Sequence, residues 1–285
     1  MSKCKTIAIA NQKGGVRKTT TTFNLGIALT KNNKKVLLVD ADPQANLTTY
    51  MGFYDEENIP VTLSTLIERY IDDEEIKPEQ AILHHEEGID LIPSNLNLAM
   101  TESNLSNAMS REYAMRKSLE ELKSIYDYII IDCMPSLSML ITNALAMADE
   151  VIIPVQSQYF SARGTGNLLK IISKVKKQIN SKLQVGGILL TLVDSRTKLP
   201  NKIKQELKEN YGDIVKLYDT QIPSAIKTAE STSKGKSIFA YDKNSKVTQA
   251  YTNFAKEVLT DNERRKNEIT KDDVRWIFYN TRWKR

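Results

Sequence analysis

Apolar and polar residues follow two alternating patterns along most of the chain. Short, near-continuous apolar runs are separated by stretches in which apolar residues recur at helical spacing. Such runs suit strands that are buried on both faces, which requires a mainly parallel sheet with helices on both sides. The sequence therefore predicts an α/β fold: a doubly wound, mainly parallel sheet flanked by helices. The predicted strands are residues 6–10, 35–39, 89–92, 126–131, 151–155 and 185–192.

The pattern predicts one main domain, residues 1–261, without an internal repeat or a Pro/Gly-rich linker. Segment 54–87 is acidic and weakly periodic apart from a helical pattern at 63–70, so we expect a surface excursion there. Residues 262–285 differ in composition and form a predicted C-terminal extension. In open sheets of this class ligands bind beyond the carboxyl ends of the strands, so candidate chemistry is expected just after each strand.

The net charge of the 285-residue chain is +5, and most of the basic excess lies in residues 262–285, which hold eight Lys/Arg and four Asp/Glu. A positive balance suits an anionic partner such as nucleic acid or a membrane surface, although solvated charge explains it as well. No apolar run approaches the ~18 residues of a membrane span, and the first residues do not look like a signal peptide, so we expect a cytoplasmic protein. Cys4 and Cys133 are predicted to be reduced thiols.

A candidate phosphate-binding loop follows the first predicted strand. Residues 11–20 read Asn-Gln-Lys-Gly-Gly-Val-Arg-Lys-Thr-Thr and precede a helical pattern. Glycines let backbone N–H groups surround phosphate oxygens, Lys18 can reach the β- and γ-phosphates, and Thr19 can ligate Mg²⁺. A plain glycine turn before a helix explains Gly14 and Gly15 but not the Lys-Thr pair. The predicted ATP-binding residues are Lys13, Gly14, Gly15, Val16, Arg17, Lys18, Thr19 and Thr20.

Residues 13–19 resemble the deviant Walker A motif, KGGxxK[ST], of the ParA/MinD superfamily of P-loop ATPases. The resemblance covers roughly residues 3–260 and is closest to the short, Soj-like ParA proteins. It implies the P-loop NTPase fold and ATP with Mg²⁺ as cofactors. It also implies that Lys13 reaches across a dimer to the partner's nucleotide, so that ATP holds two subunits together.

Arg17 departs from the family pattern, which has glycine immediately before the Walker lysine. Glycine allows close backbone approach, so a long cationic side chain there could clash, strain the loop or redirect Lys18. Arginine also binds phosphate well, and retained or tightened nucleotide binding is the opposite outcome. The sequence leaves both outcomes open: an ATPase of reduced activity, or an undamaged site.

Carboxylates end two of the predicted strands. Residues 39–44 match the VDxDPQ motif of ParA proteins, and an extended chain puts Asp40 and Asp42 on one side. The resemblance implies that Asp42 positions the attacking water and that Asp40 lies near the metal. Asp132 ends the strand at 126–131 in a stretch similar to the family's Walker B region, DxPP, with Met134 in place of the first proline. It is expected to hold Mg²⁺. An Asp-Pro turn is the plain alternative for residues 42–43.

The DNA and partner surfaces are inferred from the segment after Ile222 and Pro223. ParA relatives carry arginines there that grip DNA without sequence preference, and this chain has Ser224 and Lys227 at those places. The candidate phosphate contacts are Lys227, Lys234 and Lys236. A solvated lysine face is the alternative. No helix-turn-helix precedes the first strand, so the chain resembles the short ParA class and specific DNA reading is expected to belong to a partner. The resemblance also implies an ATP-dependent homodimer and a ParB-like centromere-binding partner.

The C-terminal extension contains aromatic residues among basic ones. Thr270 and Asp273 could cap a helix. One face of that helix would carry Val274, Ile277, Phe278 and Thr281. Such a helix could dock on the domain, bind a partner or lie on an anionic membrane; docking and partner binding are preferred, and a membrane is not the expected partner.

These observations predict a Mg²⁺-dependent ATPase that dimerises with ATP, associates with the nucleoid and partitions plasmid, chromosomal or mobile-element DNA. The alternatives are a MinD-like membrane-surface switch and a ParA-like interaction protein whose ATP site is impaired by Arg17. An iron-protein relative is disfavoured because the cysteines needed for a cluster are missing. His84 and His85 lie in the acidic excursion and are expected to be solvated rather than catalytic.

Overall fold

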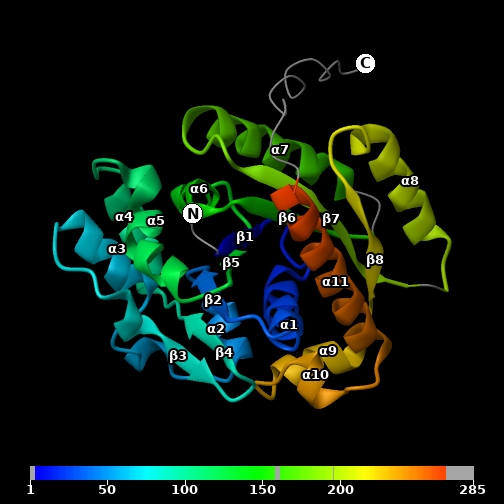
Figure 1. Ribbon diagram of the computed structural model, residues 1–285, viewed down its shortest axis with the longest axis horizontal. Helices are drawn as coiled ribbons and strands as arrows, with labels where there is room; N and C mark the ends of the chain where they lie inside the picture. Colours follow the sequence, from blue (N-terminus) through cyan, green and yellow to red (C-terminus); the bar gives the residue numbers. More distant parts are fainter. Residues whose placement is uncertain (1–3, 158–160, 195, 268–285) are drawn as a thin grey trace.

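The computed structural model describes residues 4–157, 161–194 and 196–267, with only the backbone given at 161–164 and 266–267 (Figure 1). Within that part of the chain, one sheet of eight strands has the order β3-β4-β2-β5-β1-β6-β7-β8. All neighbouring strands are parallel except β3 and β4. The strands are β1 Lys5–Ile9, β2 Val36–Ala41, β3 Leu83–His85, β4 Ile89–Ile92, β5 Tyr128–Cys133, β6 Glu150–Gln156, β7 Gln184–Val193 and β8 Leu217–Pro223.

Burial explains why these runs form central strands. Every residue of β2 and of β5 is buried, so both faces of the sheet centre are covered. Alternate residues contribute to two separate cores: Ile129 belongs to one and Ile130 to the other. The predicted doubly wound α/β class is therefore confirmed, and all six predicted strands are present with ends that differ by no more than two residues.

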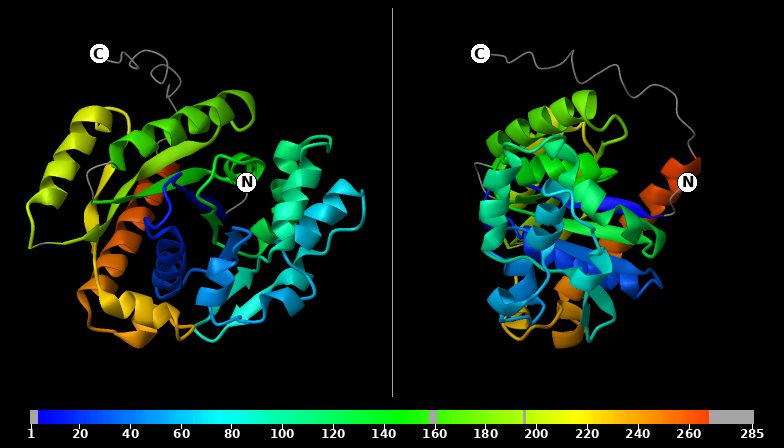
Figure 2. Two further views of the ribbon diagram at one scale, coloured as in Figure 1. Left: turned by 180° about the vertical axis from the view of Figure 1, so that it is seen from behind. Right: turned by 90° about the vertical axis from the view of Figure 1, so that its left-hand side faces the viewer.

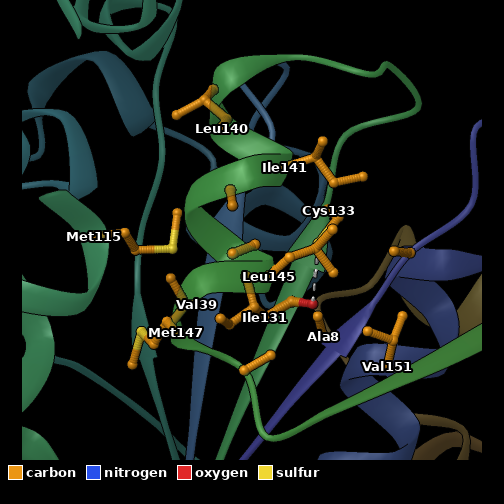
Figure 3. Packing of buried hydrophobic residues seen from close by; sticks show 14 of the residues in the cluster. Ala8, Val39, Met115, Ile131, Cys133, Leu140, Ile141, Leu145, Met147 and Val151 are labelled. Atoms are coloured by element: carbon orange, nitrogen blue, oxygen red, sulfur yellow. Dashed lines mark hydrogen bonds between the residues drawn. The ribbon is translucent and has the colours of Figure 1, made fainter. Parts of the chain in front are cut away.

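Helices form a layer on each side of the sheet, and Figures 1 and 2 show the arrangement from three directions. The core that contains Ile130 includes side chains of α1, α2, α10 and α11, and the core that contains Ile129 includes side chains of α3 to α8. Figure 3 shows α6 and α5 packing against β1, β2, β5 and β6 in this second core. The helices are α1 Lys18–Thr30, α2 Asn46–Tyr50, α3 Leu63–Ile71, α4 Asn97–Leu105, α5 Ala114–Leu119, α6 Met139–Met147, α7 Ser161–Gln178, α8 Leu199–Tyr211, α9 Ile226–Thr232, α10 Ile238–Tyr241 and α11 Lys246–Asn267.

The segment 54–87 is less of a surface excursion than its composition indicates. The expected short helix is α3, and its inner side chains Leu63, Leu66 and Ile67 are fully buried. The expectation that His85 is solvated is wrong. His85 is buried, its Nε2 lies 3.1 Å from the carbonyl oxygen of Gly235, and its ring meets Phe23 edge-on. His84, by contrast, is exposed beside Asp90.

Helix α11 continues past residue 261, where the sequence predicts the end of the main domain. Asn262 is buried and donates a hydrogen bond to the hydroxyl of Tyr128 in β5 (3.3 Å). Arg265 forms an ion pair with Glu150 of β6. These contacts attach α11 to the sheet as far as Arg265. The helix expected around Thr270 to Thr281 lies outside the described residues.

No helix in the described ranges has the length and apolar character needed to cross a lipid bilayer.

Candidate functional site

The loop between β1 and α1 is held in place from two neighbouring strands. The Asn11 amide donates a hydrogen bond to the carbonyl oxygen of Pro154 in β6 (2.6 Å) and accepts one from the N–H of Lys13 (3.0 Å). Farther along the loop, the Thr191 hydroxyl of β7 donates to the carbonyl oxygen of Val16 (3.0 Å). The loop conformation is therefore fixed by contacts with the carboxyl ends of β6 and β7.

The two glycines of this loop border open space. Within the described part of the chain, no atom beyond their chain neighbours lies within 4 Å of the place where a Cβ would stand on Gly14 or on Gly15, and both residues are exposed. Gly15 has φ +73°, a left-handed conformation that glycine adopts without steric cost. An exposed turn of this shape, followed directly by a helix N-terminus, matches the geometry that binds phosphate through backbone N–H groups.

Lys18 is the first residue of α1 and points its ammonium back under the loop. It is 7% exposed, and its Nζ donates to the carbonyl oxygen of Lys13 (3.3 Å). Burial lowers the pKa of Lys18, while the negative charges of Asp132 and Asp42 oppose that effect. The buried cation and the two acidic side chains therefore lie in one electrostatic environment beneath Gly14 and Gly15.

The acidic residues come from the ends of adjacent strands. β2 and β5 are parallel neighbours, and Asp40 stands directly in register with Asp132. Both carboxyl groups are fully buried, and burial raises the pKa of each, to about 7 for Asp40. The charge of Asp40 raises the pKa of Asp132 further. Two buried carboxyl groups this close favour a bound cation, because a cation offsets both desolvation and repulsion.

The two paired carboxylates differ in how their oxygens are used. Asp40 accepts hydrogen bonds from the N–H and hydroxyl of Thr48 (both 2.8 Å) and from the N–H of Asp42 (3.2 Å), so it fixes the start of α2. The carboxylate of Asp132 accepts hydrogen bonds from two hydroxyl groups of α1, those of Thr19 and Thr22, with Thr22 Oγ1 3.3 Å from its Oδ1. Asp132 with Thr19 is therefore the better-placed pair for a metal, and Asp40 supports it from behind.

The residues present fit a magnesium–nucleotide complex. The described part of the chain holds no group of three His, Cys, Asp or Glu side chains able to enclose a metal ion. Mg²⁺ is ordinarily bound through one or two protein oxygens together with substrate phosphates and water, which Asp132 and Thr19 could supply. Two buried oxygens in the loops after β1 and β5, Gln12 Oε1 and Ser136 Oγ, also lack a hydrogen-bond partner among the described residues.

Asp42 and Lys13 lie at the rim of this site. Asp42 is 8% exposed, and its Oδ1 accepts the N–H of Gln44 (3.0 Å). Lys13 is half-buried and turns toward its own subunit, with Nζ 3.5 Å from Gln156 Oε1 at the end of β6. The structure thus brings Lys13, Lys18, Asp42 and Asp132 to one edge of the sheet, the edge that the strand order predicts.

Arg17 has a backbone conformation that the sequence could not reveal. It occupies the residue before α1 with φ 67° and ψ 35°, in the left-handed region, and its side chain makes no capping hydrogen bond. A side chain with a Cβ is disfavoured in this conformation by ~1–2 kcal/mol relative to right-handed backbone. This position therefore requires the conformation that the family's glycine adopts freely.

The three lysines predicted to contact DNA lie in and after α9. Lys227 is exposed, but its Nζ is 2.7 Å from Asp242 Oδ2, so its charge is already paired. Lys234 and Lys236 are exposed on the turn that carries Gly235.

Sequence reasoning missed several residues that shape the site without carrying charge: Asn11, Thr22, Thr48 and Thr191. Thr22 belongs to the threonine run at 19–22, which offers a local signal. Thr48 and Thr191 act through contacts between segments distant in sequence, so no local pattern marks them.

Comparison with known proteins places this geometry in a family. The sequence model of a family described as an AAA domain matches residues 4–185. The sporulation initiation inhibitor protein Soj of Bacillus subtilis is 41% identical over 254 residues, 89% of this chain and 98% of Soj. The chromosome partitioning protein ParA of Caulobacter vibrioides is 36% identical over 259 residues, 90% of this chain and 94% of ParA. The crystal structure of cobyrinic acid a,c-diamide synthase from Mycobacterium smegmatis with bound ADP and magnesium superimposes with a TM-score of 0.79 at 35% identity, covering 91% of this chain and 96% of that one.

Proposed function

Because this chain belongs to the ParA/Soj family of P-loop ATPases, we propose that it partitions DNA as an ATP-dependent dimer that binds DNA without sequence preference and is stimulated by a ParB-like partner. The observation that carries the proposal is the register pair of Asp40 and Asp132 beside buried Lys18, beneath the open Gly14–Gly15 turn. The partitioned DNA would be a plasmid, a chromosome or a mobile element, depending on which of them the ParB-like partner binds.

ATP binding is assigned to the loop and the start of α1. Backbone N–H groups of residues 13–20 would surround the phosphates, and Lys18 would move from the Lys13 carbonyl onto the β- and γ-phosphate oxygens. Asp132 and Thr19 would hold Mg²⁺, with Asp40 keeping the strand ends in place. Bound Mg²⁺ supplies charge neutralisation at the transferring phosphoryl group.

Hydrolysis is assigned to positioning rather than to covalent chemistry. One carboxylate oxygen of Asp42, Oδ1, accepts the N–H of Gln44, so the role in hydrolysis is assigned to the other oxygen. That oxygen would accept a hydrogen bond from the attacking water. Lys13, which lies near Gln156 in the single chain, would swing outward to the partner's phosphates in the dimer. The nucleotide would then be shared by two subunits.

DNA association is assigned to basic residues on the surface. Ammonium groups contact phosphates as point charges and read no base sequence, so such binding is strong only at low salt. Lys234 and Lys236 are available for this role, whereas Lys227 would first have to leave Asp242. Nucleoid association follows from this binding, and sequence-specific recognition is left to the partner.

Two other functions compete with this proposal. A MinD-like membrane switch would act through residues 268–285, which lie outside the described residues. An interaction protein without turnover would follow if the left-handed Arg17 prevents the loop from closing on phosphate. The VDxDPQ motif at residues 39–44 and the identity to Soj and ParA over most of the chain favour the partitioning ATPase.

The deciding experiment measures ATP hydrolysis by the full chain with Mg²⁺, with and without duplex DNA of mixed sequence. We expect the chain to hydrolyse ATP at a rate that changes when DNA is added. We also expect ATP-dependent DNA binding, with an affinity that falls steeply with salt concentration and hardly varies with base sequence. Absence of both ATP binding and hydrolysis supports the interaction protein instead. Binding to vesicles of anionic lipid, without binding to DNA, supports the membrane switch.

A further inference from the structure

A cavity of about 460 Å³ opens at the end of α1 opposite the phosphate loop. It lies where the C-terminal end of α1 meets α10 and α11, and Figure 1 shows these three helices next to one another. Its lining includes Lys31, Asn32, Phe239, Lys243, Thr252 and Lys256. None of the described residues that line it is acidic, so the cavity presents three ammonium groups from three different segments of the chain.

The acidic residues beside these lysines in sequence are engaged elsewhere. Asp242, which precedes Lys243, is 2.7 Å from the Lys227 ammonium. Glu257, which follows Lys256, accepts the N–H groups of residues 219 and 220 at 3.0 and 2.8 Å. The positive charges of Lys243 and Lys256 are therefore not cancelled by their nearest acidic neighbours.

Lys31 is held over an aromatic ring rather than by a carboxylate. Its Nζ lies 5.8 Å from the centre of the Phe239 ring, a cation–π arrangement that leaves the ammonium free to contact an anion. Phe239 itself is only 5% exposed. Its face is covered, so it offers no surface on which a nucleobase could stack.

These features indicate which class of ligand fits the cavity. Three separate lysines without a bidentate arginine or an accessible aromatic face suit phosphate groups that are recognised by charge alone. A free nucleotide would leave its base without a partner here. The phosphodiester backbone of DNA presents successive negative charges and can bind without base contacts. It therefore matches a cavity with cations directly after α1, on α11 and on the connection between α10 and α11.

The cavity is separated from the phosphate loop by the length of α1. Lys18 begins that helix and Lys31 directly follows its end, so ~20 Å of helix lies between them at 1.5 Å per residue. A phosphate bound at Lys31 therefore leaves room for nucleotide at Lys18. The same helix touches both ligands.

We propose that Lys31, Lys243 and Lys256 form a binding site for backbone phosphates of DNA. This inference rests on the proposed DNA association and names the surface responsible for it, in addition to the turn at Lys234 and Lys236. The site sits on the opposite end of α1 from the nucleotide, so DNA and ATP bind to one subunit at once.

The test compares the full chain carrying Lys31→Ala, Lys243→Ala and Lys256→Ala with a control carrying Lys117→Ala, Lys182→Ala and Lys208→Ala. All six lysines are exposed, and both variants lose the same charge. Binding of a fluorescent duplex is measured with ATP and Mg²⁺ at several salt concentrations. For the cavity variant we expect at least tenfold weaker binding at constant salt and a salt slope reduced by about one per lysine, with the control close to the parent.

The possible outcomes test the phosphate site and the proposed DNA function separately. Equal affinity and salt slope in the cavity variant and the parent overturn the site while leaving the DNA function standing. Equal losses in both variants show that net charge alone matters, which also overturns the site. A parent that does not bind DNA overturns the proposed function and the site together. In a further experiment, pyrophosphate is titrated into the Lys18→Ala chain. If pyrophosphate binding needs the three lysines and DNA binding does not, the cavity is a site for free phosphates instead. Equal thermal melting of all variants shows that folding is not the cause.

Discussion

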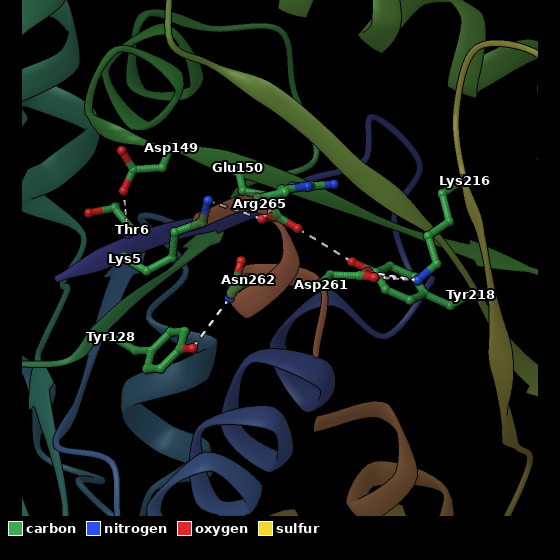
Figure 4. A network of polar contacts seen from close by, with 10 residues as sticks. All are labelled: Lys5, Thr6, Tyr128, Asp149, Glu150, Lys216, Tyr218, Asp261, Asn262 and Arg265. Atoms are coloured by element: carbon green, nitrogen blue, oxygen red, sulfur yellow. Dashed lines mark hydrogen bonds and ion pairs between the residues drawn. The ribbon is translucent and has the colours of Figure 1, made fainter. Parts of the chain in front are cut away.

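Arg265, in the last turn of α11, places its guanidinium Nη1 2.8 Å from Oε2 of Glu150 at the start of β6. The Glu150 side chain is 1% exposed, and Lys5 Nζ approaches the same oxygen at 3.3 Å. The Tyr218 hydroxyl lies 3.5 Å from Oε1 of Glu150. Figure 4 shows the four side chains close together where β1, β6 and β8 begin. A buried carboxylate is tolerated only with such partners, so α11 is attached to the sheet through charge as well as through its apolar face.

Removing this attachment is expected to destabilise the domain. Arg265→Ala leaves Glu150 with Lys5 as its only cation among the described residues, and we expect the free energy of unfolding to fall by ~1–3 kcal/mol. Urea unfolding measures the change. Arg116→Ala, which breaks an exposed pair with Glu120, is the control and should cost less than ~1 kcal/mol. Equal losses in the two variants would show that the Arg265 pair carries no special weight.

This pair also shows where sequence reasoning stops. A change in composition at 262 predicts a separate extension, but composition does not reveal that Arg265 meets a glutamate more than a hundred residues away. The helix therefore continues across the predicted boundary. The same limit applies to the register of Asp40 with Asp132: the motifs identify both residues, and only the pairing of β2 with β5 brings them together.

Strand prediction succeeded where burial is complete on both faces and failed at the edges of the sheet. β8 has only two buried residues, Tyr218 and Ile222, and contains the exposed Asp219, and β3 has three residues, two of them histidine. Neither has the apolar run that marks a central strand. The misassignment of His85 has the same origin, because an acidic neighbourhood in sequence does not report that the ring packs against Phe23 of α1.

Lys18→Ala should weaken ATP binding by about 100-fold. Lys18 is the loop cation that burial and the nearby Asp132 and Asp42 hold beneath the glycine turn. Losing charge-assisted hydrogen bonds of this kind costs ~3 kcal/mol, or about 100-fold in affinity. Calorimetric titration with ATP and Mg²⁺ measures it. Lys13→Ala is the matched control, which should keep nucleotide binding and lose ATP-dependent dimerisation. Unchanged affinity in the Lys18 variant refutes the site.

Asp42→Ala should separate dimer formation from turnover. The carboxylate lies at the rim of the site and is expected to act on water rather than on nucleotide, so sedimentation with ATP should still show dimers while hydrolysis falls by ~10²–10⁴-fold. Asp42→Asn keeps an acceptor for the N–H of Gln44 and serves as the isosteric comparison. Turnover equal to that of the parent in either variant would show that the Asp42 carboxylate is not needed for hydrolysis.

Both cysteines should resist thiol reagents in the native chain. Burial raises the pKa of Cys4 to about 12 and also raises that of Cys133, so both thiols stay protonated at pH 8. The unfolded state ionises near pH 8.5, so the contribution of these thiols to stability is complete below that pH and declines as the pH rises above it. Labelling with a chromogenic disulfide at pH 8 should be slow without urea and fast with it. Rapid labelling of the folded chain contradicts the burial.

The backbone conformation of Arg17 bears on whether this residue impairs the ATP site. Its left-handed backbone is disfavoured by ~1–2 kcal/mol for a residue with a Cβ, whereas glycine adopts it freely but gains entropy in the unfolded chain. Arg17→Gly should therefore raise the free energy of unfolding by ~0.5–1 kcal/mol. The loop should also close on phosphate more readily.

We accordingly expect Arg17→Gly to hydrolyse ATP faster than the parent and to form more ATP-dependent dimer. The side chain is half-buried within electrostatic reach of Tyr251 in α11, whose pKa burial raises to about 12 and the Arg17 charge slightly lowers. If ~1 kcal/mol of loop strain is relieved on the way to the transition state, turnover rises about fivefold. Arg17→Ala is the decisive companion, because it removes the guanidinium but keeps the Cβ in the left-handed region. A gain in the glycine variant alone assigns the defect to the backbone, and a gain in both assigns it to the guanidinium. Lower activity and less dimer in both variants mean that Arg17 assists the nucleotide, and the assignment of the parent as the weaker enzyme is then wrong.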